Sequence, residues 1–102
     1  MTQAKSNIAK KPAVLVWQSY GTTRVHPCGT AGHLTAIIAE IGNIIADWGD
    51  DKAFDDMTRA VRMFVDRQNF TRAHNEIRSF CQRHSDHESF EVFEFCNIEE
   101  LA

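Results

Sequence analysis

Three residues whose side chains can bind transition metals lie close together near position 84. Cys81, His84 and His87 follow one another at intervals of three residues. Thiolate and imidazole are ligands that Zn²⁺ prefers in a tetrahedral site. The spacing matches no standard pair of zinc ligands, and Cys81 falls on the apolar stripe of its segment, as a small core residue does. The three residues are therefore weak candidates for a metal site, and we expect no bound cofactor.

A second group of similar residues surrounds Cys28, with His26 before it and His33 after it. A thiol at the start of a helix can be unusually acidic, which makes Cys28 a candidate nucleophile with His33 as its base. The chain has no glycine-rich phosphate-binding motif and no other catalytic motif. We therefore expect a protein that is not an enzyme, and we keep a small zinc- or thiol-dependent protein as the second alternative.

Arginines recur in the second half of the chain, where helices are expected. The candidates for contacts with nucleic-acid phosphates are Arg59, Arg62, Arg67 and Arg72. Arginine side chains on exposed helix faces suit such contacts. The whole chain is nevertheless acidic, with a net charge of −3 and a pI near 5.9, whereas dedicated nucleic-acid-binding domains are usually basic. A nucleic-acid-binding regulator is therefore the first alternative.

The C-terminal part of the chain has the opposite character. Residues 85–102 contain no Lys or Arg and carry six carboxylates. The candidates for contacts with a partner protein are Glu91, Glu94, Glu99 and Glu100. Carboxylates along a strand and tail can dock on a basic protein surface, although charges on an edge strand also serve to prevent aggregation. We take a partner with a basic surface as the expected ligand.

The sequence predicts a flexible basic arm over residues 1–12, followed by a single domain over residues 13–102. The arm contains Lys5, Lys10 and Lys11 and ends at Pro12. It has no apolar stretch that fits a secretory signal, and no segment approaches the ~20 apolar residues of a membrane span. Three cysteines cannot all pair within the chain. These features predict a cytoplasmic protein with reduced thiols and no membrane contact.

Strands are expected at both ends of this domain. Residues 13–20 are rich in β-branched and aromatic side chains, and Gly21 can turn the chain into a second short strand over 22–26. Residues 90–96 are rich in aromatic side chains, carry apolar residues on both faces and form the third candidate strand. Terminal strands that pair across a helical middle predict a small antiparallel sheet.

Three helices are expected between the strands. A first apolar stripe begins at Leu34 and ends at Trp48, with Thr30 as N-cap and Gly49 as C-terminal stop. Two further stripes follow, interrupted at Gln68–Asn69, which leaves open whether they form two helices or one bent helix. The apolar positions of these stripes are Phe54, Met57, Val61, Phe64, Phe70, Ala73, Ile77 and Phe80.

The sequence thus predicts an α+β fold in which the hairpin and C-terminal strands form a small sheet against about three helices. Without a catalytic motif, we expect a small non-catalytic adaptor or inhibitor that binds another protein, and a homodimer is a further arrangement to consider. Many inhibitors encoded by phages and mobile elements, anti-CRISPR proteins among them, are small acidic proteins of this kind. That analogy is one of class alone, because no motif in the chain supports it.

Overall fold

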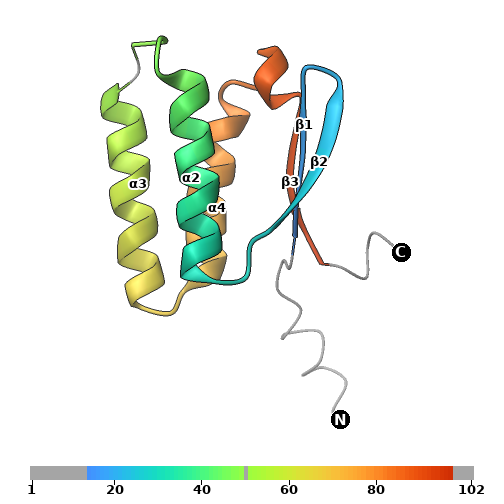
Figure 1. The fold of residues 1–102 in the computed structure, drawn as a ribbon. Coiled ribbons are helices and arrows are strands. Elements are labelled where there is room, and N and C mark those ends of the chain that lie inside the picture. Colours follow the sequence, from blue (N-terminus) through green and yellow to red (C-terminus); the bar gives the residue numbers. More distant parts are fainter. Residues whose placement is uncertain (1–13, 50, 98–102) are drawn as a thin grey trace.

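The structure, a computed structural model, describes residues 14–49 and 51–97. The arm predicted over residues 1–12 lies outside these ranges. The elements are, in chain order, β1 (Val14–Ser19), β2 (Thr22–Pro27), α2 (Ala31–Ile45), α3 (Asp51–Asp66), α4 (Phe70–Gln82), the 3₁₀ helix η1 (Glu88–Phe90) and β3 (Val92–Cys96). Three helices stand together on one face of a three-stranded antiparallel sheet (Figure 1). The predicted α+β fold is confirmed.

The sheet has the order β2-β1-β3, so the N-terminal strand is central. A two-residue turn at Tyr20 and Gly21 joins β1 to β2, and both residues have positive φ, 51° and 79°. Positive φ at both positions is the type I′ geometry, which matches the twist of paired strands and suits glycine. The expectation that residues 22–26 join the sheet is confirmed. β3 pairs with the other side of β1, which brings the two ends of the domain together.

The core fills the space between the sheet and the helices. Leu15 and Trp17 of β1 point into it, since they alternate with half-buried residues along the strand. Trp17 is only 3% exposed, and its ring stacks on Phe90 and meets Phe93 edge-on. Cys28, in the loop after β2, is also buried, and the helices supply the other buried apolar side chains, which are Leu34, Ile37, Ile41, Ile45, Met57, Val61, Ala73, Ile77, Phe80 and Cys81. The predicted helical stripes therefore face the sheet and one another.

The ends of the helices differ in part from the prediction. The Thr30 side chain caps α2 by accepting from the His33 amide at 3.1 Å, as expected. The helix ends at Ile45, three residues before Trp48, because residues 46–49 form a turn that closes at Gly49 with φ 76°. This turn moves Trp48 away from the apolar stripe of α2. The Trp48 ring instead contacts the rings of two histidines near the end of α4.

The interruption after α3 separates two helices. Gln68 adopts a φ of 61°, which ends α3, and the Asn69 side chain accepts from the Arg72 amide and caps α4. The residues before β3 differ from the prediction as well. Phe90 belongs to η1, so the strand begins at Val92 and Phe90 packs into the core from a tight turn.

Candidate interaction surface

β3 is an edge strand whose outward main-chain groups have no partner strand within the described residues. The turn at Tyr20 and Gly21 makes Ser19 and Thr22 a hydrogen-bonded pair, so alternate residues of β1 bond to β2 and the others bond to β3. Val16 consequently bonds to Glu94. By the same alternation, the N–H and C=O groups of Phe93 and Phe95 point toward the free edge. The edge offers these groups in an extended row.

A groove lies beside this edge, between β3 and the C-terminal end of α4. Its volume is about 390 Å³. It is lined by Cys81, Gln82, Ser85, Phe90, Glu91, Val92, Phe93 and Glu94. The buried residues among these supply an apolar floor, and the charged residues along its border are Glu91 and Glu94. An apolar floor next to a border with two glutamates and, among its described lining residues, no basic residue suits an occupant that carries both apolar and basic groups.

The two described glutamates of the predicted partner site lie in different environments. Glu94 is exposed in β3 opposite Val16, on the face of the sheet away from the helices. Glu91 lies just before β3, and its carboxylate accepts from the Gly21 amide at 2.8 Å. That bond ties the residue before β3 to the hairpin turn. Glu99 and Glu100 lie outside the described residues, so the structure describes two of the four predicted residues.

The face of the sheet away from the helices, here called the helix-free face, is largely apolar. By register it carries Val14, Val16, Gln18, Thr23, Val25, Pro27, Val92, Glu94 and Cys96. Val25 is 55% exposed and Val92 37% exposed. No described element packs on this face (Figure 1). Sequence composition does not reveal this surface, because strand alternation alone does not say which face the helices cover.

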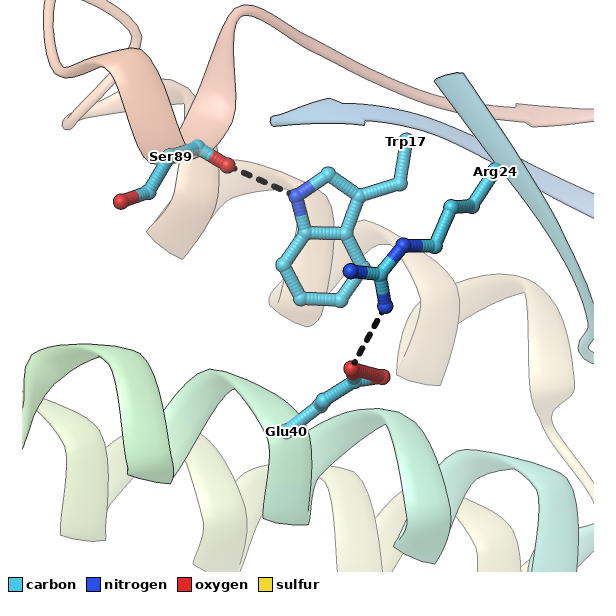
Figure 2. A network of polar contacts seen from close by, with 4 residues as sticks. All are labelled: Trp17, Arg24, Glu40 and Ser89. Atoms are coloured by element: carbon cyan, nitrogen blue, oxygen red, sulfur yellow. Dashed lines mark hydrogen bonds and ion pairs between the residues drawn. The ribbon is translucent and has the colours of Figure 1, made fainter. Parts of the chain in front are cut away.

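The opposite edge of the sheet differs from the edge at β3. A pocket of about 220 Å³ lies between β2 and α2, and the Arg24 guanidinium reaches across to the Glu40 carboxylate at 3.3 Å. Figure 2 shows this ion pair beside the Trp17 ring, whose Nε1 donates to the Ser89 carbonyl at 2.8 Å. β2 also ends in Pro27, which has no N–H to offer at an edge.

The arginines predicted for nucleic-acid contacts do not form a uniform positive face. Arg59 lies 3.6 Å from the Asp56 carboxylate, which also binds Lys52. Arg62 lines a second groove, between α2 and α3, together with Asp66. The Arg72 guanidinium lies over the Phe64 ring at 5.7 Å. Arg67 is exposed in the turn after α3. Acidic side chains are therefore interleaved with basic ones on this side of the molecule.

The three residues considered for metal binding differ in how deeply they are buried. Cys81 is fully buried, and burial raises the pKa of its thiol. His84 and His87 lie against the Trp48 ring at centroid distances of 5.3 and 4.4 Å. Within residues 14–49 and 51–97, no three His, Cys, Asp or Glu side chains are placed to hold a metal ion. His84 and His87 instead join an aromatic cluster at the end of α4.

Cys28, the candidate nucleophile, is also fully buried. Burial, with a smaller contribution from Cys96, raises the pKa of its thiol to about 11. This direction is opposite to the one expected for a thiol at a helix N-terminus. The proposed base His33 is otherwise engaged, since its Nδ1 accepts from the Gly29 amide at 3.2 Å. The structure therefore gives Cys28 the surroundings of a core residue.

His74 is a buried histidine that the sequence analysis did not single out. Its Nε2 donates to the Cys28 carbonyl at 2.8 Å, and its ring lies 4.5 Å from the Phe95 ring between centroids. Its Nδ1 is buried and has no partner among the described residues. Burial lowers the pKa of His74, and the bond to Cys28 opposes this shift in part. The residue connects α4 to the end of β2 and to β3.

Comparison with known proteins identifies no relative, because no family model, no curated protein and no solved structure matches this chain. Within residues 14–49 and 51–97, no helix combines the length and apolar character needed to cross a membrane.

Proposed function

We propose that this protein is a small non-catalytic adaptor or inhibitor that binds another protein through the β3 side of its sheet. The observation that carries the proposal is the open edge of β3, where Val92 and Glu94 are exposed beside a groove with an apolar floor. Open strand edges pair readily with other chains, and exposed apolar side chains beside charged ones are common in protein interfaces. The proposal rests on these features of the surface.

The expected partner presents a basic surface. Residues 84–97 contain no Lys or Arg, and they carry Asp86, Glu88, Glu91 and Glu94. A concentrated negative region of this kind attracts a basic partner and accelerates encounter more than it increases affinity. We place this interaction in the cytoplasm, where the three free cysteines stay reduced. A second copy of the chain is the other occupant to be tested.

A photo-crosslinking residue at position 94 tests the proposal in cells. We expect a covalent adduct with one partner protein from position 94. We expect none from position 63, where Met63 is exposed on α3 and serves as the control. Interferometry with the captured partner should then show an association rate about tenfold lower for Glu94→Lys, with a smaller decrease for Glu94→Gln.

The nucleic-acid alternative predicts a different set of results. Tight binding to random duplex DNA or RNA at physiological salt would support it, especially if Arg59→Ala or Arg62→Ala lowered the salt dependence by about one charge each. The absence of any adduct at position 94, together with such binding, would overturn the protein-binding proposal. Unchanged binding in both arginine variants would exclude their role in the alternative.

A further inference from the structure

We propose that the ligand of this surface is an extended basic peptide segment of the partner, which adds a fourth strand to the sheet along the free edge of β3. This inference rests on the proposed function and specifies the form of the ligand. β3 spans five residues, Val92–Cys96, and therefore pairs with about five residues of an added strand, or roughly 17 Å. Addition of a strand to an exposed sheet edge is a recurrent mode of peptide recognition.

The main chain of β3 presents an ordered row of hydrogen-bonding groups at the edge of the sheet. The inward-facing residues Phe93 and Phe95 are held in the core side of the sheet, and their main-chain groups point toward the free edge. Phe93 is buried and Phe95 packs against the core. The row of donors and acceptors is thus fixed in an extended form before any ligand binds. An ordered edge lowers the entropic cost of pairing with a peptide.

The groove beside β3 limits which side chains a bound strand can carry. Side chains of an added strand alternate between the two faces of the sheet. Those on the helix side enter the groove, whose floor includes Cys81, Phe90 and Phe93. Those on the helix-free face lie beside Val92 and Glu94. The ligand that fits is a segment in which apolar residues alternate with Lys or Arg.

The edge at β2 is less suited to a basic peptide than the edge at β3. At β2, Pro27 removes an N–H from the free edge, and the ion pair between Arg24 and Glu40 bridges the adjacent pocket. Arg24 also places a positive charge there, which repels a basic peptide. The charged residues that line the groove at β3 are both acidic. Strand addition by a basic segment is therefore assigned to β3.

Selection from a displayed library of random linear ten-residue peptides tests this assignment directly. Enriched peptides should show apolar residues alternating with Lys or Arg. Added to the ¹⁵N-labelled protein, a selected peptide should shift the amide resonances of Phe93 and Phe95 the most, because these amides gain new hydrogen bonds. Resonances of Gln82 and Ser85 at the groove should also move. Resonances of Thr23 and Val25 in β2 should stay in place.

Two synthetic forms of a selected peptide provide a matched control for strand pairing. N-methylation at alternate residues blocks one hydrogen-bonding edge of an extended peptide and leaves the other edge intact. Methylation in one register should abolish binding, and methylation in the other should preserve it. Glu94→Lys should weaken binding about tenfold or more, whereas Thr23→Lys on β2 should leave it unchanged. Circular dichroism checks that both variants are folded.

Several results would overturn the inference. They are the absence of any enriched peptide, equal tolerance of both methylated forms, or resonance shifts centred on β2 or on α3. Self-association of the chain through β3, seen by sedimentation, would make a second copy the occupant. If the partner crosslinked at position 94 still depends on Glu94 but no linear peptide binds, strand addition is wrong and the proposed function stands. If neither a partner nor a peptide binds, both proposals fail.

Discussion

The two edges of this small sheet differ in the side chains that they carry and in the space beside them. β2 ends in a proline, and a side-chain ion pair from Arg24 to Glu40 crosses the pocket between this strand and α2. β3 has an open groove beside it whose charged lining residues are two glutamates. Both strands pair with the same central strand and follow the same antiparallel geometry. The difference therefore arises from side chains and not from the topology of the sheet.

This difference shows how an edge can be protected or left available. Proteins commonly limit edge-to-edge pairing with proline, charge or a covering element. β2 uses the first of these at Pro27, and the Arg24–Glu40 bridge spans the pocket beside it. At β3 the single charge within the strand is Glu94, which discourages pairing with an acidic chain or a second acidic copy and favours a basic one. The same residue can thus prevent aggregation and select a ligand.

Trp17→Ala is expected to have the largest effect, because this residue supports both edges from the central strand. Its ring packs on Phe90 and Phe93 near β3 and lies 5.6 Å from the His26 ring of β2. Replacing a buried aromatic side chain with alanine costs about 3–5 kcal/mol of unfolding free energy. Urea denaturation followed by circular dichroism measures this loss. A loss below about 1 kcal/mol would show that the two edges are stabilised independently of Trp17.

The pH dependence of stability tests the connection that His74 makes between the two edges. Because burial lowers its pKa below the ordinary value of 6.5, the unfolded chain binds the proton more readily than the folded one. The contribution of His74 to stability is therefore complete above pH 6.5 and is lost as the pH falls through the lower pKa of the folded state. His74→Gln keeps an amide donor for the Cys28 carbonyl and does not titrate.

Urea denaturation of both proteins between about pH 7 and pH 5 gives the measurement. The original protein should lose more unfolding free energy over this range than His74→Gln. The other four histidines are unchanged between the two proteins, so the comparison isolates position 74. Parallel pH profiles would show that the pKa of His74 is the same in the folded and unfolded states, so that its ring is not buried between Cys28 and Phe95.

Much of the fold could be predicted from the sequence because it depends on local patterns. Content of β-branched and aromatic residues, with the turn at Gly21, indicated the three strands, and helical spacing identified the buried positions of the helices, such as Ile41 and Ile77. The ends of elements were predicted less well. Trp48 and Phe90 continue the apolar patterns of their segments, yet both lie in turns where they meet one another at the end of α4. Contacts between distant segments decided these positions, and a local pattern does not encode them.

The candidate site was predictable in its charge and not in its geometry. The acidic character of the C-terminal segment could be read from composition, and Glu94 lies on the exposed surface of β3. The bond between Glu91 and Gly21 joins residues seventy positions apart, so sequence spacing could not reveal it. The groove likewise depends on how α4 packs beside β3. Buried His74 was missed because histidine on an apolar stripe carries no clear local signal.

A comparison of Glu91→Ala with Glu94→Ala should separate the structural glutamate from the binding one. Loss of the bond to the Gly21 amide should cost about 0.5–1.5 kcal/mol of unfolding free energy. Glu94→Ala removes an exposed side chain without such a bond and should change this energy by less than about 0.5 kcal/mol. Urea denaturation measures both. Equal effects on stability would mean that Glu91 does not anchor the hairpin turn.

The ion pair at β2 should have the smallest effect on stability, and it provides the most direct test of the difference between the edges. Arg24 and Glu40 are both substantially exposed, so their coupling in a double-mutant cycle should lie between about 0 and 1 kcal/mol. Opening this pocket with Arg24→Ala and Glu40→Ala should still not create a peptide site at β2, because Pro27 continues to lack an amide donor at that edge. The peptides selected for β3 should therefore bind the double variant with unchanged affinity and without shifting the resonances of β2. New shifts at Thr23 or Val25 in that variant would show that the ion pair, and not the proline, keeps the edge at β2 closed.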